Sequence, residues 1–124
     1  MGGKARVLVV DDEPGVGRLF RDVLERQGYE TVVAQDGLQA LRFAQNQRFD
    51  LVFLDLCMPG LDGVTTLKYL KHHNPDINVV IITGHGSTKQ ITESLERGAA
   101  VCLMKPLSIA QIRDTVALFT EAPA

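Results

Sequence analysis

Apolar residues along the chain gather in short runs that are separated by segments of helical periodicity. The runs richest in Val, Ile and Leu cover residues 7–10, 51–54, 79–82 and 101–104. Such runs are typical of strands that are buried on both faces of a parallel sheet. A shorter and more polar run at 30–34 predicts a further strand, which we expect at a sheet edge.

Between and after these runs, apolar residues recur three and four positions apart, as on one face of a helix. Pro14, Asp36-Gly37 and Asp62 mark the expected starts of the first three helices. Ser87 with Gln90, and Ser108 with Gln111, have the spacing of capping boxes that begin the fourth and fifth. The expected inward-facing residues are Val16, Leu19, Phe20, Val23, Leu24; Leu38, Leu41, Ala44; Val64, Leu67, Leu70; Ile91, Leu95; and Ile109, Ile112, Val116, Phe119.

This alternation of strands and helices predicts an α/β fold with a doubly wound, parallel, five-stranded sheet. The first, third, fourth and fifth strands end in polar residues that could take part in chemistry, whereas the second ends at Ala34-Gln35 with no obvious chemistry. That difference favours the strand order 2-1-3-4-5, with the switch point between the first and third strands. The fourth helix has few apolar positions, and we expect it to be the one most easily moved.

The residues that follow the strands predict a site at one edge of the sheet. Asp11-Asp12 follows the first strand, Asp55 the third, Thr83-Gly84 the fourth and Lys105-Pro106 the fifth. Ligands of such sheets bind beyond the carboxyl ends of the strands. Crowded carboxylates repel one another unless a cation neutralises them, and oxygen ligands suit Mg²⁺, for which Mn²⁺ is an expected substitute.

These groups match the needs of phosphoryl transfer to an aspartate. A carboxylate can accept a phosphoryl group as an acyl phosphate. The transfer then depends on positioning and on neutralisation of charge, which Lys105 and the Thr83 hydroxyl can supply.

Length and composition further limit the number of domains and the kinds of partner that the protein can have. The 124 residues suit one domain, which we place at 6–119 between an N-terminal start or remnant at 1–5 and a C-terminal tail or linker start at 120–124. A net charge of −2 argues against binding to nucleic acid or to an anionic membrane, and no apolar run is long enough to span a bilayer. Cys57 and Cys102 lack the spacing of a zinc site, and we expect reduced thiols in a cytoplasmic protein.

Four motifs, in order, resemble the receiver domain of two-component response regulators, over about Arg6 to Phe119. They are Val9-Val10-Asp11-Asp12-Glu13, the segment from Leu54 to Gly63, Ile82-Thr83-Gly84 and Lys105-Pro106. The resemblance implies a flavodoxin-like (βα)5 fold and a signalling role without turnover of an external substrate. It also implies a sensor histidine kinase or phosphotransfer protein as partner, an output domain or target protein, and homodimerisation.

The resemblance further implies the role of each residue at the predicted metal site. Asp55 would be the phosphoacceptor. Asp12 would bind Mg²⁺ directly and Asp11 through water, and the backbone carbonyl of Cys57 would complete the protein ligands.

It also implies roles for the residues around the phosphoryl group. Thr83 and Lys105 would bind phosphoryl oxygens, with a cis peptide bond before Pro106. Side chains at Cys57 and His85 would flank the phosphoryl group and tune the lifetime of the phosphoaspartate.

One position departs from the family pattern. Many members carry an aromatic residue three positions before the lysine, where this chain has Cys102, and no Phe or Tyr lies between Thr83 and Lys105. We therefore expect the signal to pass mainly through the Thr83-Gly84 loop and the fourth helix.

Three alternative hypotheses stand beside this interpretation. A pseudo-receiver would bind partners without phosphorylation. A phosphatase with an aspartyl-phosphate intermediate would resemble a DxDxT pattern with a cap insertion, whereas this chain has Asp11-Asp12-Glu13 and no room for a cap. A flavin-binding protein would need a Gly- and hydroxyl-rich phosphate loop, and here that loop is acidic.

Overall fold

The apolar runs form one parallel sheet in the computed structural model, which describes residues 5–84 and 87–120. The sheet has the order β2-β1-β3-β4-β5, so the predicted order is confirmed. The strand bounds are β1 Arg6–Val10, β2 Glu30–Ala34, β3 Leu51–Asp55, β4 Asn78–Thr83 and β5 Val101–Met104. Since every pairing is parallel, all carboxyl ends of the strands lie at one edge.

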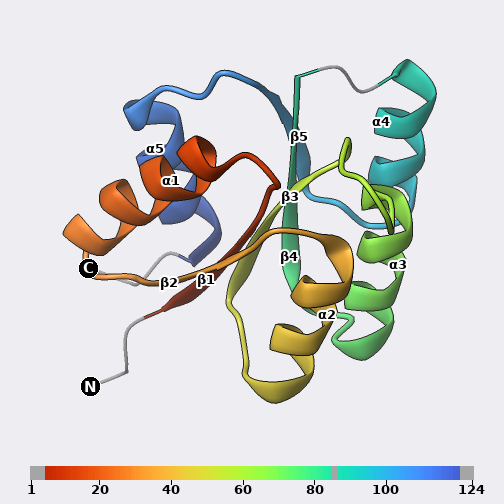
Figure 1. Ribbon diagram of the computed structural model, residues 1–124, viewed down its shortest axis with the longest axis horizontal. Coiled ribbons are helices and arrows are strands. Elements are labelled where there is room, and N and C mark those ends of the chain that lie inside the picture. The colour runs from red at the N-terminus through yellow and green to blue at the C-terminus, as the bar shows by residue number, and fades with distance from the viewer. Residues whose placement is uncertain (1–4, 85–86, 121–124) are drawn as a thin grey trace.

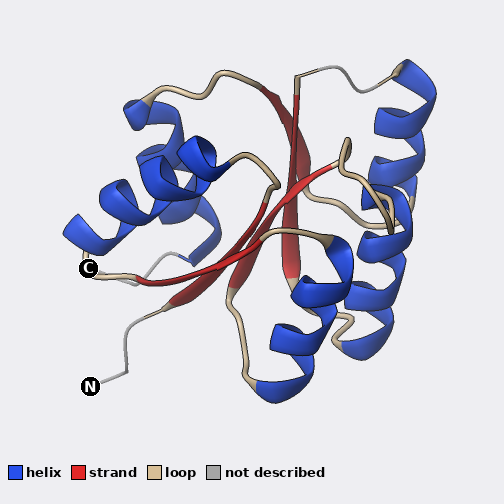
Figure 2. Ribbon diagram, in the orientation of Figure 1, coloured by secondary structure: helices blue, strands red, loops and turns tan. Residues whose placement is uncertain are grey.

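Helices cover both faces of this sheet (Figure 1). Their bounds are α1 Pro14–Arg26, α2 Gly37–Asn46, α3 Gly63–His73, α4 Thr88–Glu96 and α5 Ile109–Thr120. Figure 2 shows α1 and α5 on one face and α2, α3 and α4 on the other. None of the helices within residues 5–84 and 87–120 is long and apolar enough to cross a membrane.

The sheet separates two apolar cores, because successive side chains of a strand point to opposite faces. Val7 and Val9 of β1 pack toward α1 and α5, where the rings of Phe20 and Phe53 lie 4.7 Å apart. Leu8 and its neighbours on alternate positions pack toward α2 and α3. The central strands β1, β3 and β4 are buried almost throughout. The backbone at their carboxyl ends, where the site forms, is therefore held in place by packing on both faces of the sheet.

The predicted helix starts are confirmed by hydrogen bonds. The Asp62 carboxylate accepts the Thr65 N–H at the start of α3. Ser87 and Gln90 form a reciprocal capping box at α4. The same reciprocal pair of bonds joins Ser108 and Gln111 at α5.

Some expected core positions were wrong. Leu38 of α2 is 59% exposed and Ile109 of α5 is 54% exposed. At α2, Gly37 and Ala40 are the buried residues, so the neighbouring Leu38 turns outward. Ile109 and the exposed Leu19 line a groove beside the contact of α1 with α5 instead of packing on the sheet.

In α4 the expected core contact at Leu95 was also wrong, because Leu95 is exposed. The buried residue of this helix is Ser94, whose hydroxyl donates to the Gln90 carbonyl at 2.9 Å. Ile91 packs against the core, although only in part. A helix held by so little buried apolar surface is easier to displace than its neighbours.

Candidate functional site

The three predicted acidic residues come together at the carboxyl edge of the sheet. Asp11 and Asp12 follow β1 and Asp55 ends β3, and each offers a carboxylate oxygen within 4.8 Å of the others. Asp11 is 1% exposed and Asp55 is 3% exposed, whereas Asp12 faces solvent. Their convergence follows from the switch point between β1 and β3, which are direct neighbours in the sheet.

Local backbone turns orient the two buried carboxylates. Asp11 Oδ1 accepts the Glu13 N–H at 2.9 Å, and Asp55 Oδ1 accepts the Cys57 N–H at 3.0 Å. Such bonds to an N–H two residues on are typical of Asp in turns. Each bond uses one oxygen of its carboxylate and leaves the other oxygen turned toward the shared site.

Close packing behind Asp55 fixes its backbone. A Cβ on Gly63 would lie 2.6 Å from the Leu56 Cα and 2.7 Å from the Asp55 carbonyl oxygen. No side chain fits at that distance from backbone atoms. The glycine therefore allows α3 to begin directly against the end of β3.

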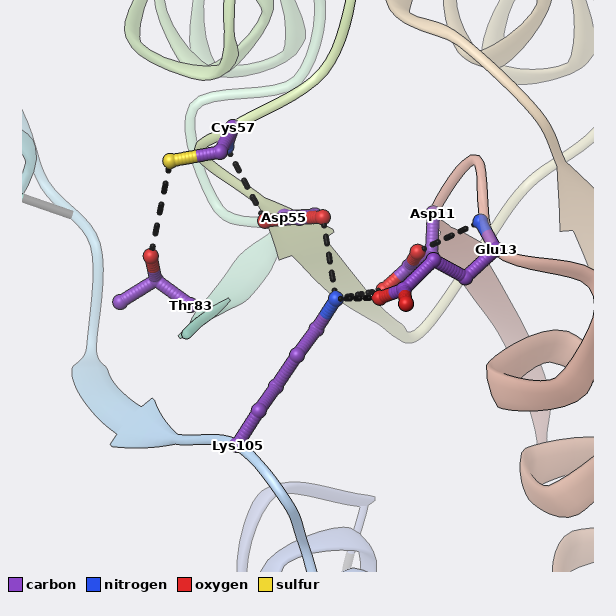
Figure 3. Close-up of polar contacts among 6 residues, drawn as sticks. All are labelled: Asp11, Glu13, Asp55, Cys57, Thr83 and Lys105. Carbon is purple, nitrogen blue, oxygen red and sulfur yellow. Dashed lines mark hydrogen bonds and ion pairs between the residues drawn. The ribbon is translucent and has the colours of Figure 1, made fainter. Parts of the chain in front are cut away.

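Lys105 reaches into the acidic cluster from the loop that follows β5 (Figure 3). Its Nζ lies 2.7 Å from Asp11 Oδ2, 2.7 Å from Glu13 Oε1 and 3.1 Å from Asp55 Oδ2. The Lys105-Pro106 peptide bond is cis, as the resemblance implied. Lys105 thus places one positive charge among three carboxylates: Asp11 after β1, Asp55 at the end of β3 and Glu13 at the start of α1.

The surroundings of Asp11 and Lys105 raise the pKa of both groups. Burial raises the pKa of Asp11, even though Lys105 and the Glu13 N–H favour its charged form. Burial alone would lower the pKa of Lys105, but the close contacts of its ammonium with the carboxylates of Asp11, Glu13 and Asp55 outweigh burial and raise that pKa. Lys105 is therefore a firmly charged ammonium.

Thr83 and Cys57 lie on the other side of Asp55. Thr83 ends β4 and is buried, and its Oγ1 is 3.8 Å from Cys57 Sγ. The exposed Cys57 lines a pocket of about 650 Å³ together with Asp55, Gly84 and Lys105. The pocket gives an incoming group access to the Asp55 carboxylate.

The donor set fits a hard divalent cation. All of its side-chain ligands are carboxylate oxygens, which is the chemistry that Mg²⁺ prefers. Asp11 Oδ2 is buried and, within the described residues, has an ion pair with Lys105 but no well-directed hydrogen bond. Such an oxygen has an unused lone pair that a metal ion or its bound water can take.

Other residues of the sequence prediction lie outside this cluster or outside the described residues. Cys102 lies in β5 beside Ile81 of β4, is half-buried and packs against the core, and burial raises the pKa of its thiol. His85, predicted to tune the phosphoaspartate lifetime, lies outside the described residues. The metal-ligand role of the Cys57 carbonyl stays a prediction.

Sequence reasoning missed Glu13 as a member of the site. The motif Val9-Val10-Asp11-Asp12-Glu13 includes this glutamate, but of its acidic residues only the two aspartates were assigned roles. The contact of Glu13 with Lys105 joins residues 92 positions apart, so it depends on the fold. One feature of the sequence could have indicated this role. Glu13 stands just before the helix that begins at Pro14, at the N-cap position, where Glu is not a favoured residue.

Comparison with known proteins identifies the family. The chain matches the response regulator receiver domain over residues 7–117. It belongs to this family. As a receiver domain, it is of a class that binds Mg²⁺ at an acidic pocket and interacts with histidine kinases or phosphotransfer proteins and with output domains.

Similar proteins include short and long regulators. Sporulation initiation phosphotransferase F of Bacillus subtilis (strain 168) is 42% identical over 111 residues, which cover 90% of this receiver domain and 90% of that protein. The transcriptional regulatory protein ZraR of Klebsiella oxytoca is 37% identical over 93% of this chain, which spans 26% of ZraR's own length.

The fold is likewise that of solved receiver domains. The crystal structure of a CheY-like response regulator receiver domain protein from Methanospirillum hungatei JF-1 superposes with a TM-score of 0.91 at 26% sequence identity. That similarity covers 94% of this chain and 93% of the other. The flavodoxin-like fold predicted from the sequence is thereby confirmed.

Proposed function

We propose that this receiver domain accepts a phosphoryl group on Asp55 from the phosphohistidine of a sensor histidine kinase or phosphotransfer protein. The modified domain then changes conformation and controls an output domain or target protein. The observation that carries the proposal is the orientation of the Asp55 carboxylate. Oδ1 is held by the Cys57 N–H, and Oδ2 is directed to the Lys105 ammonium in the open pocket.

The proposed step is a single displacement at phosphorus. A carboxylate oxygen of Asp55 forms a bond to phosphorus while the bond from phosphorus to the histidine nitrogen breaks, and that nitrogen keeps the electron pair. Lys105 neutralises charge on the phosphoryl oxygens. The Thr83 hydroxyl donates a hydrogen bond to one of them after it has turned toward the site.

Asp11, Asp12, Asp55 and the backbone carbonyl of Cys57 would hold Mg²⁺, for which Mn²⁺ could substitute. The ion would neutralise the carboxylates and the arriving phosphoryl oxygens. The oxygen donor set and the buried Asp11 Oδ2 support this assignment.

The remaining parts of the proposal concern the chain as a whole. The receiver unit covers 6–119, and it promotes only its own phosphorylation and dephosphorylation. It acts in the cytoplasm and forms homodimers, without direct contact to nucleic acid or membrane.

The conformational change on phosphorylation involves Thr83, Gly84, His85 and α4, because Cys102 replaces the usual aromatic residue.

Phosphoramidate tests the proposal, since its phosphorus–nitrogen bond resembles that of phosphohistidine. We expect the parent protein with Mg²⁺ to gain one phosphoryl group by intact mass, and the gain to be lost with a chelator or in Asp55→Asn. No gain in the parent despite measurable Mg²⁺ binding would contradict the proposal. No gain together with no Mg²⁺ binding would favour a pseudo-receiver that acts only as an interaction surface.

A further inference from the structure

Glu13 occupies a helix start without acting as a conventional cap. It is the N-cap residue of α1, yet its side chain makes no capping bond within the described residues. Its backbone carbonyl accepts the N–H groups of Val16 and Gly17, as in any first turn. Ser, Thr, Asp and Asn are the residues that favour this position. Capping of α1 therefore does not explain why a glutamate stands at this position.

The side chain of Glu13 instead reaches the Lys105 ammonium. Glu13 Oε1 lies 2.7 Å from Lys105 Nζ, as short as the contact of that ammonium with Asp11. The Glu13 side chain is 62% exposed and lines the rim of the pocket, whereas Asp11 and Asp55 are buried. Lys105 thus has one exposed partner, Glu13, and two buried ones, Asp11 and Asp55; Figure 3 shows all three contacts.

The two buried partners, Asp11 and Asp55, belong to the acidic cluster that fits a divalent cation, and Glu13 does not. An ammonium and a divalent cation on the same carboxylate oxygens repel each other strongly, because charges a few ångströms apart in a partly buried site are weakly screened. Lys105 must therefore give up its contacts with Asp11 and Asp55 when the cluster binds metal.

We propose that Glu13 is a positioning residue that keeps the Lys105 ammonium at the rim of the pocket when Asp11 and Asp55 bind Mg²⁺. This inference rests on the proposed function of the acidic cluster. Glu13 stabilises the displaced lysine and so favours metal binding. It also holds the ammonium beside the pocket, within reach of a phosphoryl group on Asp55.

A double-mutant cycle with Lys105 separates this role from a general effect of charge. In Glu13→Gln, the ammonium has only the metal-binding carboxylates as charged partners within the contacts described, so it competes more strongly with Mg²⁺. We expect calorimetry to show Mg²⁺ bound about three- to fivefold more weakly, the scale of a partly exposed ion pair. In the Lys105→Met background, the same substitution should change the affinity by less than about twofold.

Glu25→Gln is the matched control, because it removes the same charge from an exposed position of the same helix. We expect its Mg²⁺ affinity to equal that of the parent. Circular dichroism of each variant checks that the fold is kept.

The outcomes distinguish this inference from the proposed function. An equal loss for Glu13→Gln in both backgrounds would mean that Glu13 acts on the metal without Lys105, and would overturn the inference. A parent that binds Mg²⁺ with an unchanged Glu13→Gln variant would overturn the inference alone. A parent that binds no Mg²⁺ would overturn both the inference and the proposed metal site.

Discussion

Asp11 is a carboxylate that has been almost wholly removed from water. Burial raises its pKa, and the nearby Asp55 charge acts in the same direction, while Lys105 and the Glu13 N–H partly offset both. A raised pKa in the folded state means that folding disfavours the charged form. The charge is thus retained at a cost in stability, which is consistent with a role in the site.

Asp11→Asn should therefore raise the free energy of unfolding in Mg²⁺-free buffer at neutral pH, by about 1 kcal/mol. The gain should shrink as the pH falls through the raised pKa of Asp11, since protonation then neutralises the parent as well. Urea denaturation at several pH values measures it. Asp12→Asn, at an exposed position, is the control, and a loss of stability in Asp11→Asn at neutral pH would refute the argument.

Cys57 connects the backbone of the acceptor to the hydroxyl of Thr83. Its N–H holds Asp55 Oδ1, and its Sγ lies 3.8 Å from Thr83 Oγ1. Because Ala keeps the backbone bond and removes only the thiol, Cys57→Ala should speed loss of the phosphoryl group more than it changes the capacity of Asp55 to accept one.

We expect the decay to accelerate about fivefold, equivalent to about 1 kcal/mol of activation free energy, as water gains access to the phosphoryl group. Intact mass followed over time measures the decay, with His85→Ala as a second variant predicted to change it. Equal decay rates for the parent and both variants would rule out tuning by these side chains.

At the scale of elements, the junction of β3 with α3 is the most constrained part of the site. Gly63→Ala would force a Cβ against Leu56 Cα and the Asp55 carbonyl. We expect a loss of more than about 2 kcal/mol in unfolding free energy, because backbone atoms at both contacts must move.

Gly15→Ala is the matched control, since nothing lies within 4 Å of a Cβ at that position of α1. It should stabilise the protein by about 0.5–1 kcal/mol through helix propensity. Denaturant unfolding of both variants measures the contrast. Similar stabilities of the two variants would contradict the packing argument.

Helix α4 is the element we expect to respond to phosphorylation. It follows Thr83 by a short loop, its buried residue is Ser94, and its start depends on the Ser87 capping box. Addition of beryllofluoride, a phosphoryl mimic, should shift backbone NMR resonances of Gly84 and α4 more than those of α2. Unchanged α4 resonances alongside a shifted Asp55 would disprove signalling through this helix.

For the molecule as a whole, the sequence predicts the sheet order and the meeting of the three aspartates. Both follow from short-range patterns, namely apolar runs, their polar ends and the period of the helices. The exposure of Leu38 and Ile109 was not predictable in the same way. In α2 the buried positions are Gly37 and Ala40, and Ile109 lines a groove with Leu19, and periodicity alone does not encode such tertiary placement.

The contact of Glu13 with Lys105 was missed for the same reason. Each residue alone reads as an exposed charge, and only the packing of α1 beside the loop after β5 brings them within 2.7 Å. By contrast, Asp11, Asp55 and Lys105 could be assigned to one site because each follows a strand. Strand ends are fixed by topology, whereas side-chain pairs across loops are fixed by tertiary packing.

Locating the phosphoryl group tests the central claim most directly. After incubation with phosphoramidate and Mg²⁺, borohydride reduces an acyl phosphate to an alcohol and leaves free carboxylates intact, and peptide mass mapping then identifies the reduced residue. The account predicts reduction at Asp55 alone in the parent and at no residue in Asp55→Asn. Reduction at Asp11 or Asp12, or a phosphoryl group found on another side chain, would contradict it.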